Sequence, residues 1–308
     1  MDNKNYQQLT RTFLRLSRFS HLSAIASWDM FAMMPPGGSA ARGEALAELS
    51  VLEHQILTEP KVAQWLAAAA QEDLNDVEQS NLREMTRLHT QAALLPESLV
   101  EAKSLAGSRC EHAWRSQRPA NDWQGFSANL KEVVKLSREE ARLRADVKGC
   151  SPYDALLDIY EPDMTSAQLD GLFADLKSWL PDLLNRVVAR QSPQSLIAPV
   201  GPFPTAVQRE LGLETMSVLG FDFNAGRLDI STHPFCGGVP EDVRITTRYD
   251  ENELLSALFG VIHETGHARY EQNLPRNWLG QPVALARSTA IHESQSLFFE
   301  MQDRKSVV

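Results

Sequence analysis

Helical periodicity over most of the first 190 residues is the feature that most restricts how this chain can fold. In the first segment, apolar residues recur every three or four positions, as expected for one buried face of a helix. These residues are Leu9, Phe13, Leu16 and Phe19. The sequence PPGG at 35–38 ends the pattern, because two prolines and two glycines do not extend a helix. The periodicity therefore predicts a long first helix and a mainly α architecture.

The same period predicts further helices up to residue 192. They cover approximately 40–57, 61–71, 74–93, 97–117, 122–147 and 166–190. Thr165 is the predicted N-cap of the last of these, because its hydroxyl can accept a hydrogen bond from a free backbone N–H group. No internal repeat or low-complexity linker interrupts the chain, so residues 1–302 are interpreted as one mostly helical domain that begins with a helical part, 1–192.

Residues 193–249 follow a different pattern, which is typical of loops and short strands. A short helix is predicted to end at Leu219, and the sequence FDFNAGRLDIS then alternates around residues 224–226, which predicts a β-hairpin. The Gly/Pro-rich sequence CGGVP predicts a turn, and DVRITTRY predicts a strand from Asp242 to Tyr249. A small antiparallel β-sheet is therefore expected immediately before the next helix.

The helical period returns in residues 250–302, starting with DENELLSALFGVIHETGHARYEQ. Asp250 and Glu253 are predicted to form a capping box at the start of this helix. Farther along, His263 and His267 are four residues apart, so they share one face of the helix and both can direct a ring nitrogen at one metal ion.

Glu264 follows the first histidine of this pair. It is rotated by about 100° around the helix from its neighbour, which is too far for a third ligand but close enough to act on a water molecule. This HExxH arrangement is typical of zinc peptidases, in which the glutamate is the general base. Zn²⁺ is the expected cofactor, and Co²⁺ fits the same ligands. The alternative is a pair of surface histidines on a solvated face.

A catalytic zinc site needs a third protein ligand, and spacing alone leaves its identity open. The candidates are His292 and Glu293, in a predicted helix with the sequence STAIHESQSLFFE, and His233, in the loop after the predicted hairpin. An acidic ligand on a second helix is a known solution in zinc peptidases, which favours Glu293. Gly266 has no side chain, so another element can approach the first helix beside the metal.

Composition excludes several functions. The net charge of -10 and the absence of a basic stripe argue against a nucleic-acid-binding protein. No apolar segment approaches the length of a membrane span, and the N-terminus lacks the apolar segment of a secretory signal. Cys110, Cys150 and Cys236 show no CxxC spacing and are interpreted as reduced thiols, which indicates a cytoplasmic location.

Five segments together resemble the carboxypeptidase Taq family of cytoplasmic bacterial and archaeal metallocarboxypeptidases. They are WDMFAMMPPGG at 28–38, HPF at 233–235, DVRIT at 242–246, HETGH at 263–267 and HESQ at 292–295. The last four are in the order of the family's motifs, and the first is similar to enterobacterial members. The resemblance extends from near the start of the chain to about Gln302.

The resemblance implies that His263, His267 and Glu293 bind the metal and that Glu264 activates water. It also implies a mainly helical, zincin-like fold that is shaped like a saddle and split by a deep groove, with the small sheet along one wall. The implied assembly is a homodimer. The implied activity is removal of single residues from peptide C-termini, with broad specificity and poor cleavage near proline.

His233 and Arg244 lie in the two other family motifs and are expected to line the groove as substrate-binding residues. Arg244 could bind a peptide carboxylate or support a developing oxyanion. The alternative is that it forms an ion pair with Asp242 or Glu241 and braces the strand. For His233 the alternative is a loop histidine that is hydrogen-bonded to the backbone.

The chain departs from the family near its end. Two later family motifs, IRxxAD and GxxQDxHW, are absent, and DRKSVV ends within a pattern that reads as a continuing helix. The chain is therefore interpreted as an N-terminal portion that lacks the C-terminal part of the fold, with 303–308 as an aberrant tail. Impaired hydrolysis is expected. The alternative functions are an oligopeptidase that cuts internally and a non-catalytic helical remnant that pairs with an intact homologue.

Overall fold

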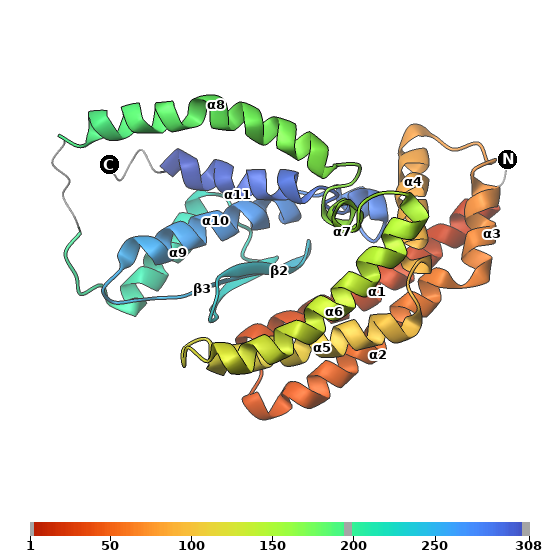
Figure 1. Cartoon of the computed structure of the whole chain (residues 1–308), viewed down its shortest axis with the longest axis horizontal. Helices are drawn as coiled ribbons and strands as arrows, with labels where there is room; N and C mark the ends of the chain where they lie inside the picture. Colours follow the sequence, from red (N-terminus) through yellow and green to blue (C-terminus); the bar gives the residue numbers. More distant parts are fainter. Residues whose placement is uncertain (1–2, 194–198, 304–308) are drawn as a thin grey trace.

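Helices make up most of the computed structural model of the chain, which describes residues 3–193 and 199–303 (Figure 1). The helices before the sheet are α1 (Lys4–Ala32), α2 (Ser39–Thr58), α3 (Pro60–Ala69), α4 (Asp76–Ala93), α5 (Glu97–Gln117), α6 (Trp123–Lys148), α7 (Pro152–Tyr160), α8 (Ser166–Gln191) and α9 (Thr205–Val218). The strands are β1 (Gly226–Ile230), β2 (Phe235–Val239) and β3 (Asp242–Thr247), and they are followed by α10 (Leu254–Gln272) and α11 (Thr289–Asp303). Residues 304–308, most of the predicted tail, lie outside the described residues.

The predicted helices of the first 192 residues are confirmed with ends that differ by one or two residues. The side chain of Thr165 accepts a hydrogen bond from the backbone N–H of Gln168, so the predicted N-cap of α8 is also confirmed. Helix α7 was not predicted. Its nine residues make too few turns for a clear period, and its signals are the N-cap Ser151 and Pro152 at the first position.

The N-terminal helices enclose their own apolar core. Leu9, Phe13 and Leu16 of α1 are buried there as the periodicity predicts, and Phe19 packs partly buried against the same cluster. The other buried members are Tyr6 of α1 and residues of α2, α3, α4 and the loop between α3 and α4. This core fixes the block of helices on which the loop between α10 and α11 later rests.

Helix α8 differs from the others because none of its residues is buried. Figure 1 shows it as a long helix running along one side of the molecule, on the side of α11. Its exposed large apolar residues are Leu172, Phe173, Leu176, Trp179, Leu180, Leu183, Leu184, Val187 and Val188. The helix therefore presents a long apolar face to solvent. None of the helices within residues 3–193 and 199–303 is both long enough and apolar enough to cross a membrane.

The sheet has three strands in the order β1-β3-β2, and it is mixed rather than antiparallel. β2 and β3 are antiparallel, but β1 pairs with β3 in parallel, with Leu228 opposite Ile245. The predicted strand DVRITTRY is confirmed as the central strand β3, which ends at Thr247. Val243 and Ile245 of this strand are fully buried, as expected for the centre of a sheet.

The predicted hairpin around residues 224–226 is wrong. Residues 221–225 form a turn in which the side chain of Asp222 accepts a hydrogen bond from the backbone N–H of Asn224. The side chain of Gln272 in α10 accepts from the backbone N–H of Asp222 and donates to the carbonyl groups of Asp222 and Ala225. These local bonds satisfy the backbone without a strand partner. The predicted turn CGGVP is also wrong, since most of it belongs to β2.

Helix α10 starts later than the capping box predicted from Asp250 and Glu253. Its N-cap is Glu253 itself, whose carboxylate accepts a hydrogen bond from the backbone N–H of Ser256. Asp250 instead accepts from the backbone N–H of Asn252 in the preceding turn. The predicted helix is confirmed, but the capping box is wrong, because the two acidic side chains cap two separate turns.

The loop between α10 and α11 is attached to the N-terminal helices. The side chain of Gln281 donates to the carbonyl of Thr10, and the fully buried Asn81 accepts from the backbone N–H of Val283. At the end of the loop, the carboxylate of Glu161 accepts hydrogen bonds from Ser288 and from the backbone N–H of Ala290. These contacts set where α11 begins.

Candidate metal centre

Packing of α10 on the sheet determines which way its histidines face. Val261 and Ala268 are buried in a cluster with Val243 and Ile245 of β3 and with Met216 of α9. The opposite side of α10 lies along α11, as Figure 1 shows. The two histidines of α10 contact side chains of α11, so the HETGH sequence faces the helix that carries the predicted acidic ligand.

Three candidate ligands converge between the two helices. Nε2 of His263 is 3.6 Å from Oε1 of Glu293, and Nε2 of His267 is 3.3 Å from Oε2 of the same carboxylate. One ligand atom from each of the three residues lies within 4.8 Å of the other two. Ligand atoms at the corners of a tetrahedral zinc site are roughly 3.3 Å apart, given bonds of about 2 Å. The three side chains therefore fit a divalent ion that keeps an open position.

His292, the alternative third ligand, has both ring nitrogens engaged elsewhere. Its Nδ1 is 2.6 Å from Nδ1 of His267, and its Nε2 is 2.7 Å from Oε1 of Glu271. Neither nitrogen is directed at the point that the other three side chains share. The geometry therefore favours Glu293 as the third ligand.

Glu264 lies near His263 and Glu293, and its carboxylate accepts a hydrogen bond from the backbone of Cys236 in β2. The side chain is buried, and burial raises its pKa to about 7. Electrostatic interactions with His263 and His233 oppose this rise in pKa, and the carboxylate of Glu293 adds to it. A carboxyl group beside the metal ligands with a pKa near neutrality can both accept and release a proton.

Burial has the opposite effect on His267. It lowers the pKa of this histidine to about 4, and the neighbouring His292 and His263 add to the decrease. At neutral pH the imidazole is uncharged and retains a lone pair, which is the form that binds a metal ion.

A small pocket of about 250 Å³ opens beside these groups. It is bounded by His267, His292 and Glu293 on one side and by the end of α7 and residues 286–289 on the other. A small molecule or one end of a peptide can therefore reach the candidate metal position.

The other two predicted site residues have local partners. Arg244 forms a two-bond ion pair with Asp242, with Nε to Oδ1 at 2.9 Å and Nη2 to Oδ2 at 2.7 Å, and its guanidinium lies 4.6 Å from the ring centroid of Trp28. Nδ1 of His233 donates to the carbonyl of Pro234 at 2.8 Å. For both residues the structure contains the contacts that the bracing alternatives predict.

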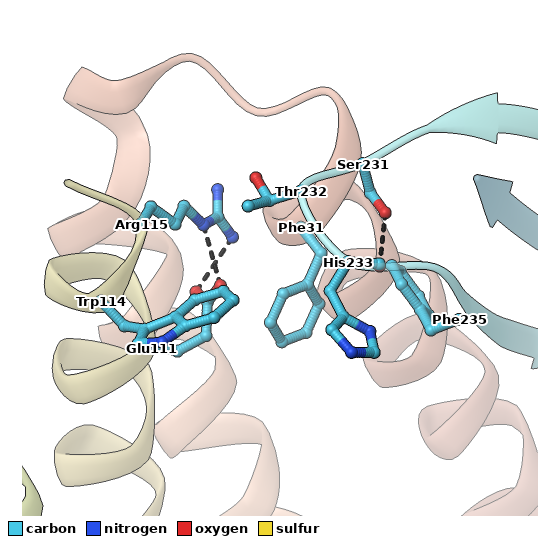
Figure 2. A pocket seen from close by; sticks show the side chains of 8 residues that line it. All are labelled: Phe31, Glu111, Trp114, Arg115, Ser231, Thr232, His233 and Phe235. Carbon is cyan, nitrogen blue, oxygen red and sulfur yellow. Dashed lines mark hydrogen bonds and ion pairs between the residues drawn. The ribbon is translucent and has the colours of Figure 1, made fainter. Parts of the chain in front are cut away.

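His233 also lines a pocket of about 470 Å³ between α1, α5 and the loop before β2 (Figure 2). Phe31 and Phe235 meet edge to face there, with ring centroids 5.5 Å apart, and Trp114 lies across from them. Arg115 is paired with Glu111 on the same helix, so the charge in the pocket is compensated. The pocket is suited to an uncharged, apolar group.

Two acidic residues that were not predicted from the sequence contact histidines of the site. Oε2 of Glu300 is 3.1 Å from Nδ1 of His263, and Glu271 reaches the other histidine of α10 through His292. The position of each in the sequence, relative to a proposed ligand, could have indicated it. Glu271 follows His267 by four residues on α10, and Glu300 follows Glu293 by seven on α11, so each lies on the face of its helix that carries the ligands.

Close contact between α10 and α11 depends on Gly266. A β-carbon at this position would lie 2.6 Å from the carbonyl oxygen of Gln295 and 2.6 Å from Cα of Ser296. Real β-carbons do not approach backbone atoms so closely, so any side chain would push the helices apart. The close approach of a second element that the lack of a side chain at Gly266 predicted is therefore confirmed.

Replacing Gly266 by Ala is expected to lower the free energy of unfolding by about 1–3 kcal/mol, as for an overpacked core. It should also weaken metal binding, because α11 carries Glu293. Chemical denaturation and metal titration would measure the two effects.

Gly260→Ala is the matched control on the same helix, because its β-carbon would meet atoms no closer than 3.8 Å. This control should be neutral or stabilising, since Ala favours helix by up to about 1 kcal/mol. Equal stability of the two variants would contradict the prediction.

A mainly helical chain that presents HETGH on one helix and a glutamate on the next has the fold and site layout of the HExxH metallopeptidases. Comparison with known proteins gives a more specific assignment. The sequence profile of the carboxypeptidase Taq (M32) metallopeptidases matches residues 8–307. The chain therefore belongs to this family, and the predicted family and mainly helical fold class are confirmed.

Individual relatives agree with this assignment. The chain is 38% identical to thermostable carboxypeptidase 1 of Thermus thermophilus, over 96% of this chain and 60% of that protein. It is 34% identical to carboxypeptidase 1 of Bacillus subtilis, over 93% of this chain and 57% of that protein. The solved structure of Trypanosoma cruzi metallocarboxypeptidase 1 superposes with a TM-score of 0.88 at 47% identity, covering 99% of this chain and 62% of that one. The chain thus spans about 60% of the length of the curated relatives that it matches.

Proposed function

We propose that this chain carries the metal centre of a metallocarboxypeptidase that removes single residues from peptide C-termini. The observation that carries the proposal is the convergence of His263, His267 and Glu293 on one point, with Glu264 on the same helix as the two histidines. The family and the names of its relatives support the reaction class. Zn²⁺ is the proposed ion, and Co²⁺ suits the same ligands.

Separate residues would bind the metal ion and transfer the proton. A zinc ion held by His263, His267 and Glu293 would supply Lewis-acid chemistry, polarising the scissile carbonyl and lowering the pKa of water. Glu264 would accept the proton of the attacking water and pass it to the leaving amine, which needs a carboxylate within hydrogen-bond reach of both. Its place on α10, next to one of the proposed ligands, supports this role.

Substrate binding is proposed on the side of the sheet. The aromatic pocket around Phe31, Trp114 and Phe235 would accept an apolar side chain of the peptide. His233 lines this pocket and stays a predicted substrate-binding residue. Arg244 also stays a prediction. Its ion pair with Asp242 uses donors on Nε and Nη2, and a guanidinium has five N–H donors, so donors on Nη1 are available for a peptide carboxylate.

Several finer predictions rest on the family resemblance. They are broad side-chain specificity, poor cleavage near proline, a homodimer and impaired hydrolysis by the 308-residue chain. A cytoplasmic location has one supporting observation, because Cys110, Cys150 and Cys236 are all unpaired. The two alternative functions, internal cleavage and a non-catalytic partner of an intact homologue, are tested by the same experiment.

The test is to purify the 308-residue chain, determine its zinc content, and incubate it with an N-blocked dipeptide and with a long peptide. Zinc-dependent release of the C-terminal residue from both, followed by mass spectrometry, is the result expected for a carboxypeptidase. Internal fragments of the long peptide would identify an oligopeptidase instead. Zinc binding without hydrolysis would support impaired catalysis. A chain that binds no zinc and co-purifies with a full-length homologue would support the non-catalytic alternative.

A further inference from the structure

We infer that two outer carboxylates fix the ring orientation and tautomer of both histidines in the proposed metal site. Glu300 acts directly on His263, whereas Glu271 acts on His267 through the intervening ring of His292. The inference rests on the proposed metal centre and assigns positioning roles to three residues that are not ligands themselves.

The contact between His263 and Glu300 defines the first tautomer. Nε2 of His263 faces Glu293 at 3.6 Å, and a nitrogen that binds a metal ion must offer its lone pair. The proton of the neutral ring is then on Nδ1, which donates to Oε2 of Glu300 at 3.1 Å. The side chain of Glu300 is only 16% exposed, so this hydrogen bond is largely shielded from water.

A longer chain of hydrogen bonds defines the second tautomer. Nε2 of His267 faces Glu293 at 3.3 Å, so its proton is on Nδ1, which donates to Nδ1 of His292 at 2.6 Å. Because His292 accepts at Nδ1, its own proton is on Nε2, and this nitrogen donates to Oε1 of Glu271 at 2.7 Å. Each ring nitrogen of His267 and His292 thus either donates or accepts in this series of hydrogen bonds. The carboxylate of Glu271 can only accept, so it determines the direction of the whole series.

Ring packing holds His292 in place for this role. Its ring centroid is 4.7 Å from that of His267, and Tyr270 meets it edge to face at 5.1 Å. With both nitrogens hydrogen-bonded, the ring can neither bind a metal ion nor rotate without breaking two hydrogen bonds. A hydrogen-bonded partner behind a ligating histidine typically changes metal affinity by about 10- to 100-fold.

The two positioning residues that contact the ligands allow graded substitutions. In Glu300→Gln the acceptor remains, whereas Glu300→Ala removes it. In His292→Asn the amide oxygen can occupy the place of the acceptor Nδ1, whereas His292→Phe keeps the ring volume and removes both nitrogens. A packing role predicts that Phe is tolerated better than Asn. The inferred role predicts the reverse.

The experiment measures the zinc affinity of each purified chain by competition with a chelator. The expected order is wild type, then Glu300→Gln and His292→Asn, then Glu300→Ala and His292→Phe, with about 10- to 100-fold weaker binding in the last two. His21→Phe, at an exposed position of α1, is the control and should bind zinc like the wild type. Circular dichroism would verify that each variant is folded.

A second readout is independent of activity and of affinity. Long-range ¹H–¹⁵N spectra of the imidazole rings should show His263 and His267 protonated at Nδ1 in the wild-type chain, with mixed tautomers for His267 in His292→Phe. Zinc affinities within threefold of wild type in all four variants, with unchanged tautomers, would overturn this inference and leave the proposed metal centre intact. A wild-type chain that binds zinc no better than His263→Ala would refute the metal centre and this inference with it.

Discussion

Replacement of Glu264 by Gln is expected to lower kcat for release of a C-terminal residue by about 10²- to 10⁴-fold, the usual contribution of a general base. The amide keeps the size of the side chain but cannot accept the proton of the attacking water. Metal affinity should be unchanged, because Glu264 is not among the three converging ligands. The loss should therefore appear in kcat rather than in zinc content, and both are measured on the same purified protein.

Glu251→Gln is the matched control for this variant. Glu251 is exposed and lies on the loop before α10, so the same chemical change there should leave both quantities unchanged. A Glu264→Gln chain that retains hydrolysis within threefold of the wild type would contradict the assigned role. Loss of zinc together with activity would indicate that the carboxylate supports the metal site rather than the proton transfer.

Replacement of Glu293 by Ala is expected to weaken zinc binding by roughly a hundredfold or more. Apparent binding free energies of about 10–16 kcal/mol for structural zinc sites, shared by four ligands, correspond to about 3 kcal/mol for each ligand. Such a loss is roughly two orders of magnitude in the dissociation constant. Metal analysis after dialysis against a weak chelator would show it, and hydrolysis should fall in parallel.

Ser294→Ala is the control for the second variant, because Ser294 is exposed and its hydroxyl contacts only neighbours on the same helix, donating to the carbonyl of Ile291 and accepting from the side chain of Gln295. It should retain the zinc affinity of the wild type. If Glu293→Ala binds zinc normally while His263→Ala does not, the ion is held by another third group. His292 would then be the first candidate, since its ring lies beside His267.

Much of the fold could be predicted from periodicity, because long helices repeat their apolar positions many times. The stripe of α1 predicted the buried residues Leu9, Phe13 and Leu16, and Thr165 was a recognisable cap. The strands were harder to predict, because a β-strand of five residues has too few positions to show a period. The parallel pairing of β1 with β3 depends on contacts such as those of Gln272, which come from a different part of the chain.

The candidate site likewise contains residues that could be predicted from the sequence and residues that could not. His263 and His267 could be placed from spacing on one helix, whereas the choice between His292 and Glu293 needed the distance between two helices. The roles of Arg244 and His233 could not be predicted from the sequence, because each side chain had several neighbouring groups with which it could form an ion pair or a hydrogen bond. The structure resolves these contacts, with Asp242 for the first and the carbonyl of Pro234 for the second.

The proposed ligands all lie between residues 263 and 293, on two consecutive helices, and α11 packs chiefly against α10. The segment between the helices is short, so bringing the ligands together costs little chain entropy. An ion at this point would stabilise the contact between α10 and α11, and it would not contact the N-terminal helices. Without it, α11 would lose one of its links to α10, while the helices that enclose Leu9 and Phe13 would keep their own core. Metal content would therefore report on the packing of α11 against α10 and not on the integrity of the N-terminal helices.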